Sequence, residues 1–189
     1  MLSCLVFLAC AGGPETRPPS VDGRSIWEES GRPAPAGLMA CLKRAEDLWS
    51  QPIPSCDPSN NMGCLGKVLN SWLITQRREL EVLEKELAAL GKADPGQTLA
   101  AVIILAKSYD LMAHKLRSMP VPQSLVADLE MARIFRLALK RSTAPLRQKA
   151  GAYWKQCARL AEKKSEAWHA ECSAQAASVD KEMATKLIN

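Results

Sequence analysis

Apolar residues recur every three or four positions along most of this chain, which is the spacing of one face of an α-helix. The pattern first appears between Pro35 and Ser50 and stops in residues 51–61, which hold three prolines and two asparagines. It resumes at Met62 and continues for about seven turns, with charged side chains on the other faces. We expect this long helix to end at Gly91, because glycine is common directly after helix C-termini.

The next predicted helix begins at Asp94 and Pro95, since proline is favoured in the first turn of a helix. Its apolar residues recur up to Leu116, and the prolines within residues 119–122 end it. A short connection from the preceding helix makes the two antiparallel neighbours. No segment alternates apolar and polar residues in the way that predicts a β-strand. The sequence therefore predicts an all-α fold built from antiparallel helical hairpins.

Further helices are expected after the proline break. Residues 123–141 carry apolar positions at helical spacing, and Ser142 or Thr143 is suited to cap a following helix with Pro145 in its first turn. The region around Lys164 has the residues of a helix end and a new cap, but no glycine or proline forces a stop. From this pattern alone, one long straight helix and a helical hairpin both remain open.

The start of the chain predicts export. Residues 1–11 form a short apolar stretch that ends in small residues, which is typical of an export signal near its cleavage site. Residues 7–10 approximate a lipobox with Cys10 as the lipidated residue, whereas residues 9–11 also match ordinary signal cleavage. The usual positively charged start is missing, so an internal start or a chance apolar terminus is a third alternative. We favour lipidation at Cys10.

Composition divides the rest of the chain into two parts. Residues 12–35 hold five prolines and several glycines, and they predict a disordered tether. Residues 36–186 predict a single helical domain, consistent with 47% hydrophobic and 24% charged residues in the chain. No apolar run reaches the ~18 residues that a membrane-spanning helix needs. A lipid anchor is therefore the only membrane attachment that the sequence predicts.

Two cysteines distinguish the straight helix from the hairpin. In one straight helix, Cys157 and Cys172 would lie about 22 Å apart, which is too far for a disulfide. In a hairpin that turns near Lys164 they are equidistant from the turn and face each other. Because an exported protein favours disulfides, we expect a hairpin closed by a Cys157–Cys172 bond.

The remaining cysteines allow one more pairing. Cys56 and Cys64 are candidates to close the polar loop before the long helix, which leaves Cys41 unpaired. The chain has no Cys-x-x-Cys pair, and its two histidines are isolated from one another. The spacings thus fit no zinc pattern, and we predict no metal site.

One group of residues in the second half of the chain forms a pattern. It consists of a tyrosine in a helix, a Pro-x-Pro-x-x-Leu motif, and the apolar and aromatic positions that follow, namely Tyr109, Pro120, Pro122, Leu125, Phe135, Leu139, Pro145, Leu146, Lys149, Ala150, Tyr153, Cys157, Ala161, Trp168 and Cys172. This pattern resembles tetratricopeptide-type helical-repeat proteins, and in particular envelope lipoproteins of Gram-negative bacteria that glide and prey on others. The resemblance implies helical pairs that act as adaptor surfaces in periplasmic and outer-membrane assemblies, without catalysis.

The match to the repeat is partial. The predicted helices are longer than a 34-residue repeat allows, and the first half of the chain contains no second copy. Glu162 stands where the repeat expects a small residue. We therefore expect a TPR-like or irregular helical bundle rather than a regular solenoid.

Candidate catalytic residues are sparse. Asp110 and His114 are four residues apart on one helix, but no nucleophile lies near them, so we interpret them as an ion pair on a solvated face. His169, near Glu162 and Glu166, is interpreted in the same way. The chain has no Gly-rich phosphate loop, no G-x-S-x-G and no carboxylate cluster with metal-ligand spacing. The sequence predicts neither an enzyme nor a cofactor or small-molecule substrate.

Charge is unevenly distributed along the chain. Ten Lys or Arg residues and a single acidic residue lie between Arg133 and Lys164, whereas four glutamates cluster within residues 79–86. One interpretation is a solvated face complemented by those glutamates. The other is a basic patch for an acidic partner or an anionic envelope surface, with candidate members Arg133, Arg136, Lys140, Arg141, Arg147, Lys149, Lys155 and Arg159.

Five tryptophans divide into two groups. Trp72, Trp154 and Trp168 lie on or beside apolar stripes and are expected in the core. Trp27 and Trp49 are better candidates for an exposed contact with a partner. Aromatic residues are too few to build a platform for nucleic-acid bases.

The sequence thus predicts a non-enzymatic cell-envelope lipoprotein that acts as a helical protein-interaction or scaffold module. Its partners would be envelope proteins, and its location either the periplasmic face of the outer membrane or the periplasm and exterior. The alternative is a secreted inhibitor or stress factor that binds a cell-wall enzyme, because small disulfide-bonded inhibitors of that kind carry a similar Trp-x-x-x-Cys ending, here Trp168 and Cys172. The basic second half argues against this alternative, since an inhibitor of a basic enzyme should present an acidic loop.

Overall fold

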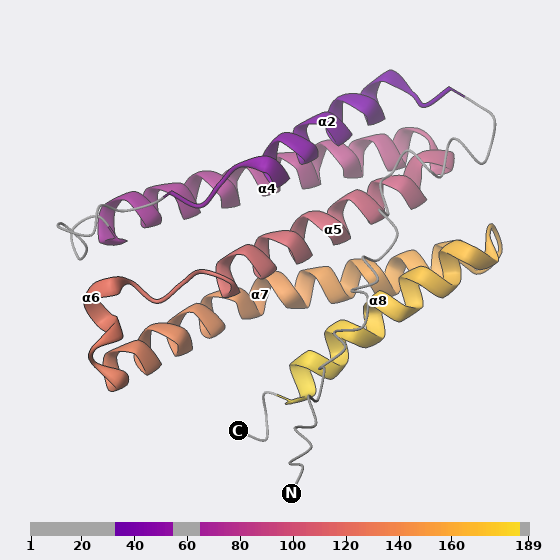
Figure 1. Ribbon diagram of the computed structural model, residues 1–189. Helices are drawn as coiled ribbons and strands as arrows, with labels where there is room; N and C mark the ends of the chain where they lie inside the picture. The colour runs from indigo at the N-terminus through magenta and orange to yellow at the C-terminus, as the bar shows by residue number, and fades with distance from the viewer. Residues whose placement is uncertain (1–32, 55–64, 186–189) are drawn as a thin grey trace, which may run out of the picture.

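The computed structural model describes residues 33–54 and 65–185, and Figure 1 shows that these residues form long helices joined by short connections. No strand is present in those two ranges, so the predicted all-α fold is confirmed. Successive long helices run in opposite directions (Figure 1). The elements are α2 (Ala36–Ser50), a π-helical turn (Leu65–Leu69) that continues into α4 (Asn70–Ala93), a 3-10 turn (Pro95–Gln97), α5 (Thr98–Arg117), α6 (Gln123–Val126), α7 (Leu129–Ala161) and α8 (Glu166–Thr185).

Helix α5 is the centre of the molecule. It packs against α2 and α4 on one side and against α7 on the other (Figure 1). Every residue of 99–106 is buried, so this helix is apolar on all faces over its first two turns. Leu42 of α2 and Leu83 of α4 pack with Ile103 of α5 in one continuous core, each at most 1% exposed. The early part of α5 thus holds the first three long helices together.

The connection between α4 and α5 confirms the helix start predicted at Asp94 and Pro95. The Asp94 carboxylate accepts hydrogen bonds from the Gly96 backbone N–H at 2.8 Å and from the Gln97 side chain at 3.0 Å. The predicted end at Gly91 is wrong, because α4 continues to Ala93. Gly91 instead lies beside the start of α5, and its carbonyl oxygen accepts a hydrogen bond from the Thr98 hydroxyl at 3.2 Å.

The predicted helix boundary at Ser142 or Thr143 is also wrong. Helix α7 runs without a break from Leu129 to Ala161, with Pro145 in its interior. Thr143 caps nothing; it is buried, and its hydroxyl donates to the Lys140 carbonyl oxygen at 3.0 Å. A proline costs a helix one backbone hydrogen bond, and the packing of the second half of α7 against α5 and α8 outweighs that loss.

The predicted C-terminal hairpin is confirmed. Helix α7 ends at Ala161, α8 begins at Glu166, and a disulfide joins Cys157 to Cys172 with their Cα atoms 5.7 Å apart. Gly151 brings the two helices close together, because a Cβ atom at this position would lie only 3.0 Å from the Val179 side chain. The hairpin is therefore a tightly packed unit.

Several predictions concern residues outside the described ranges. The export signal with Cys10, most of the tether at residues 12–35, Trp27 and the Cys56–Cys64 pair all fall there. Cys41 is buried and makes no disulfide within the described residues. None of the helices in 33–54 and 65–185 is long and apolar enough to cross a membrane.

Candidate binding groove between α4 and α7

A groove runs between α4 and α7, with α5 as its floor. One part has a volume of about 550 Å³, and the adjoining part adds about 540 Å³. The two parts share Arg77, Leu80 and Glu81 of α4 and Pro145 and Leu146 of α7, so they form one continuous depression. Helices α4 and α7 lie on opposite sides of α5 (Figure 1). The groove is large enough for several side chains of a partner.

The floor of the groove is apolar and its rim is charged. Leu80 of α4 is 1% exposed, and Met112 and Leu116 of α5 are 4% and 2% exposed. Arg77 and Glu81 lie on the rim with their side chains in solvent. An apolar floor with a polar rim is the usual composition of a protein-binding surface.

One buried polar atom in the groove wall has no partner. Gln76 is 1% exposed and donates through its side-chain amide to the Gln51 side-chain oxygen at 2.5 Å. Its own amide oxygen makes no hydrogen bond within the described residues. A buried acceptor without a donor costs free energy, so a donor from a bound segment would be favourable here.

Exposed apolar side chains extend the groove toward the N-terminal end of α7. Ile74 of α4 is 60% exposed, and Met131 and Ile134 of α7 are 38% and 46% exposed. Positions 131, 134, 138, 142 and 145 are spaced by three or four residues and therefore share one side of α7. Ser142 and Pro145 on this side line the groove. Met131 and Ile134 therefore lie on the side of α7 that faces the groove.

A tyrosine–glutamate cluster closes the opposite end of the groove. The Glu84 carboxylate of α4 accepts hydrogen bonds from the Tyr109 hydroxyl of α5 at 2.7 Å, the Lys149 ammonium of α7 at 2.7 Å, and the Tyr153 hydroxyl of α7. The Lys149 ammonium also donates to the Tyr109 hydroxyl oxygen at 3.0 Å. The two tyrosine rings stack with their centroids 5.8 Å apart. This cluster ties α4, α5 and α7 together at one point.

The protonation states of the cluster follow from these contacts. Burial alone would raise the pKa of Glu84, but hydrogen bonds from Lys149, Tyr153 and Tyr109 outweigh it, so the pKa of this carboxyl is below its ordinary value. Burial and the hydrogen bond to Glu84 raise the pKa of both tyrosines far above the ordinary phenol value. At neutral pH Glu84 is therefore a carboxylate and both tyrosines are neutral phenols, and the cluster has a structural role.

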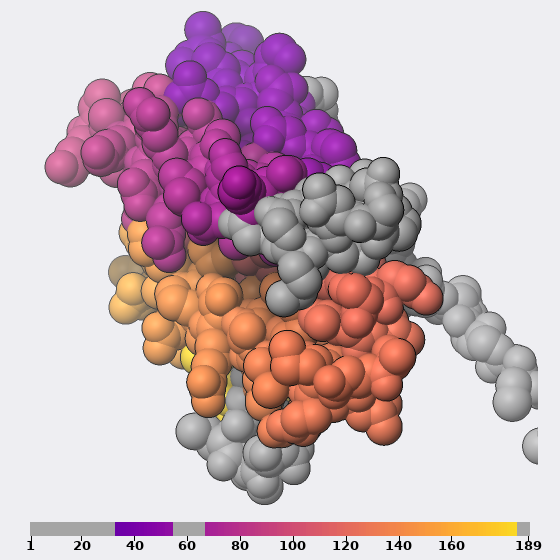
Figure 2. Space-filling model, turned by 90° about the vertical axis from the view of Figure 1, so that its left-hand side faces the viewer, coloured from indigo at the N-terminus to yellow at the C-terminus, as the bar shows by residue number. Residues whose placement is uncertain are grey.

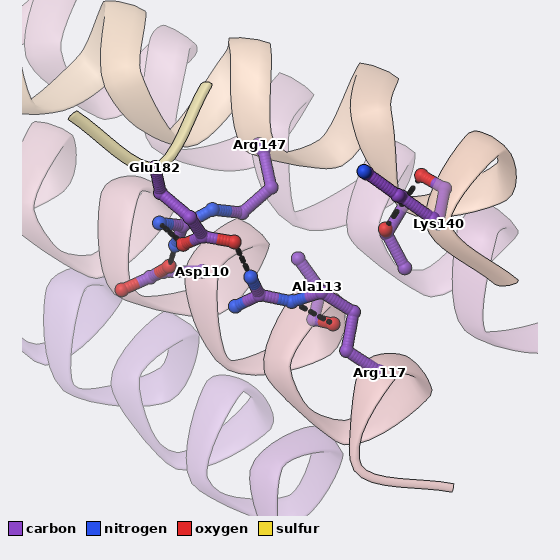
Figure 3. Close-up of polar contacts among 7 residues, drawn as sticks. Asp110, Ala113, Arg117, Lys140, Arg147 and Glu182 are labelled. Atoms are coloured by element: carbon purple, nitrogen blue, oxygen red, sulfur yellow. Dashed lines mark hydrogen bonds and ion pairs between the residues drawn. The ribbon is translucent and has the colours of Figure 1, made fainter. Parts of the chain in front are cut away.

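A second polar network lies beneath the groove, where α5, α7 and α8 meet (Figure 3). The Arg147 side chain is only 5% exposed and forms ion pairs with Asp110 of α5 and Glu182 of α8. Glu182 also pairs with Arg117 of α5, whose Nε donates to the Ala113 carbonyl oxygen at 3.4 Å. Burial lowers the pKa of Arg147 from the ordinary guanidinium value. Asp110 therefore pairs with a distant arginine rather than with His114, which is exposed.

The structure divides the predicted basic patch. Arg147 is buried, so its placement on a surface patch is wrong, because Asp110 and Glu182 draw it inward. Three other members are each paired with an acidic residue, Lys149 with Glu84, Lys155 with Asp180 and Arg133 with Glu130. The members without an ion pair in the described part of the chain are Arg136, Lys140, Arg141 and Arg159.

The remaining candidate residues have structural positions. Trp154 and Trp168 are 3% and 7% exposed, as predicted, and Trp72 is half-buried against the core. Trp49 was expected to be exposed, but it is half-buried, and its indole N–H donates to the Ser108 hydroxyl at 3.0 Å. The His169 Nδ1 lies 2.9 Å from the Ala158 carbonyl oxygen, within the C-terminal hairpin.

Sequence reasoning missed the groove, although a signal was present. Ile74, Met131 and Ile134 lie off the apolar stripe of their own helices, so each helix carries more apolar residues than one buried face needs. Such a surplus indicates a second apolar face. No cluster of three or more His, Cys, Asp or Glu that would hold a metal ion is present in residues 33–54 and 65–185.

The fold and the groove define an all-α protein with an open apolar surface between two helices. Comparison with family models, curated proteins and solved structures finds no match for this chain. The resemblance to tetratricopeptide-type proteins accordingly stays a prediction from the residues that carry it.

Proposed function

We propose that this chain is a non-catalytic adaptor of the bacterial cell envelope, and that its groove between α4 and α7 holds an apolar segment of a partner protein. The observation that carries the proposal is the continuous groove with its floor of Leu80, Met112 and Leu116 and its exposed apolar extension. Placement in the envelope rests on the export signal and the Cys10 lipobox predicted from the sequence.

The shape of the groove favours a helix as the bound segment. Two roughly parallel helix walls over an apolar floor match the way an amphipathic helix is held, with anchors every three or four residues. Ile74 lines the groove and is 60% exposed, and Ile134, which lies on the same side of α7 as the groove residue Pro145, is 46% exposed. Monomeric proteins leave few large apolar side chains so exposed in one neighbourhood unless a partner covers them.

The scaffold around the groove is suited to binding without rearrangement. Glu84 fixes the distance between α4 and α7 at the closed end through Lys149 and Tyr153. The Arg147 network fixes α7 against α5 and α8 directly beneath. A binding surface held in place before the partner arrives loses less entropy on association, which increases affinity.

Site-specific crosslinking tests the proposal. A photoreactive amino acid at Ile74 of the full chain, expressed in the source cells, should capture an envelope protein identified by mass spectrometry. The same amino acid at Ala177, which is exposed on α8, is the matched control and should not capture it. The purified pair should then bind about tenfold more weakly when Ile74 or Ile134 is changed to Asp, because each change removes one apolar contact.

Three results would overturn the proposal or part of it. Equal crosslinking from Ile74 and Ala177, or equal affinity of Ile134→Asp, Ala177→Asp and the unchanged chain, would show that the groove does not hold the partner. An unprocessed Met1 on protein recovered from native membranes would refute the envelope location, whereas an acylated Cys10 would support it. A cell-wall enzyme that loses activity on binding would instead favour the inhibitor alternative.

A further inference from the structure

A separate pocket lies where the connection between α5 and α6 meets α7. Its volume is about 370 Å³. Three of its lining residues are basic, Arg117 from the end of α5 and Arg136 and Lys140 from α7. The rest of the wall is largely apolar and consists of Met119, Pro120, Val121 and Leu139. A pocket that combines cations with apolar walls is suited to an anionic group attached to an apolar body.

Two of the three cations of this pocket have no acidic partner among the described residues. Arg136 and Lys140 lie one helical turn apart, so their side chains extend from the same side of α7. Neither forms an ion pair within the part of the chain that the structure describes. Arg117, in contrast, forms an ion pair with Glu182 on α8 (Figure 3). Two cations therefore remain available to an anion.

The acidic residues closest to Arg136 in the sequence already have hydrogen-bond or ion-pair partners. The Asp128 carboxylate accepts the backbone N–H groups of Glu130 and Met131 at 3.1 and 3.0 Å, which caps α7. The Glu130 carboxylate pairs with Arg133 at 2.6 Å. These contacts hold both carboxylates at the start of α7, one turn or more before Arg136.

An exposed apolar tip adjoins the pocket. Leu129 is 84% exposed, the largest exposed fraction among the large apolar side chains of the described residues. Steps of seven and eleven residues from Leu129 to Arg136 and Lys140 place all three on one side of α7. Val126 of α6, 50% exposed, precedes Leu129 by three residues. In Figure 2, α6 and the first turns of α7 form a salmon-coloured lobe at the surface.

Helices that lie at the surface of an anionic membrane combine exposed apolar side chains with nearby cations. The corner has this combination in Leu129, Val126, Arg136 and Lys140. An acidic protein could bind the two cations, but it would not explain why Leu129 at the start of α7 is so fully exposed. We propose that the corner formed by α6 and the first part of α7 binds anionic phospholipid, with the lipid phosphate in the pocket at Arg136 and Lys140 and with Leu129 among the acyl chains. This inference does not depend on the proposed partner groove or on a lipid anchor.

Vesicle binding of the full chain tests the inference. Co-sedimentation with vesicles of phosphatidylcholine and phosphatidylglycerol should exceed that with phosphatidylcholine alone and fall with added salt. The double variant Arg136→Ala/Lys140→Ala should lower the partition into anionic vesicles on the order of 30-fold, since each cation near such a surface contributes about fivefold. Leu129→Ala should lower the partition while retaining the salt dependence.

A matched control removes the same charge elsewhere. Arg159→Ala/Lys163→Ala changes two exposed basic residues near the other end of α7 and should leave the partition unchanged. Because both double variants retain the N-terminal segment, any membrane affinity of that segment cancels in the comparison. Hydrogen exchange gives a local measure, and residues 123–141 should be protected by anionic vesicles in the unchanged chain.

Short-chain phosphatidylglycerol below its micelle concentration and glycerol 3-phosphate distinguish a lipid from a free phosphate ester. The lipid should bind more tightly, and its binding should require Arg136 and Lys140. Equal binding of both probes would overturn the lipid assignment. Equal loss in the two double variants, or protection that does not include residues 123–141, would overturn the location. Failure to bind anionic vesicles would refute the inference and favour an acidic protein as the ligand of this corner.

Discussion

Replacing Arg147 by methionine should lower the free energy of unfolding by about 3 kcal/mol. The guanidinium is 5% exposed and joins α7 to Asp110 of α5 and to Glu182 of α8. Methionine keeps much of the apolar stem of the side chain, so the substitution mainly removes the charge and its hydrogen bonds. The change tests whether this network holds the C-terminal hairpin against the rest of the molecule.

The magnitude follows from what each carboxylate loses. Removing one partner of a buried ion pair costs roughly 3–5 kcal/mol, because it leaves a charge without compensation. Asp110 and Glu182 are 28% and 30% exposed, so water compensates part of that loss. Glu182 also keeps its ion pair with Arg117. We therefore expect a value at the lower end of the range.

Urea unfolding followed by circular dichroism measures the difference. Arg159→Met is the matched control, because Arg159 is exposed on the same helix, and it should change stability by less than about 0.5 kcal/mol. The double variant Arg147→Met/Asp110→Asn should cost less than the sum of its two single variants, since both remove the same contact. A loss below about 1 kcal/mol for Arg147→Met, or one equal to that of Arg159→Met, would refute the stabilising role of the network.

Three other predictions test separate features. The only two tyrosines of the chain, Tyr109 and Tyr153, have raised pKa values, so ultraviolet titration of the native protein should show no tyrosinate as the pH passes about 10, whereas the unfolded chain should show it there. Because the pKa of each tyrosine is higher in the folded state than in the unfolded state, the stability that the cluster contributes is complete below pH about 10 and is lost as the pH rises through the folded pKa. Tyrosinate absorbance in the native protein near pH 10 would contradict this expectation. Reduction of the Cys157–Cys172 bond, which spans 15 residues, should lower the free energy of unfolding by about 3 kcal/mol, and a chain with both cysteines changed to alanine should lose about that much less on addition of reductant. Pro145→Ala should raise stability by about 1–3 kcal/mol in the same urea assay, because it restores a donor inside α7, and a loss of stability would show that the groove wall needs the proline.

Local patterns predicted most helices, because helix starts and amphipathic faces depend on neighbouring residues. Asp94 and Pro95 mark a helix start in the sequence, and the Asp94 carboxylate caps it in the structure. The hairpin followed from the equal distance of Cys157 and Cys172 from the turn. The helix boundary predicted before Pro145 was wrong for the opposite reason. The continuity of α7 depends on packing with α5 and α8, and no local pattern contains that packing.

The surplus apolar residues of α4 and α7 can be seen in the sequence, but the contacts that join these two helices across the groove cannot. Glu84 and Lys149 are 65 residues apart, and Tyr153 lies further still along the chain. Helical spacing shows which side of a helix each residue occupies, but not which helix will lie beside it. The charge asymmetry between the glutamates of α4 and the basic residues of α7 indicated attraction between these segments, yet it did not select the pairs. The buried position of Arg147 was missed for the same reason.

Within the described residues, the two helices of the C-terminal hairpin differ in length. Helix α7 has 33 residues and α8 has 20. Cys157 lies opposite Cys172, and Arg147 lies opposite Glu182, so the same pairing places Thr185, where the described part of α8 ends, close to residue 144 of α7. The first part of α7 therefore has no contact with the described part of α8. This is the stretch that carries Leu129, Met131 and Ile134 in solvent together with Arg136 and Lys140, which form no ion pair within the described residues. Leu129, Arg136 and Lys140 lie on the side of α7 that also carries Arg147, so they continue the face that α8 covers further along the helix. Met131 and Ile134 lie on the opposite side of α7, toward the groove, and α8 does not reach that side.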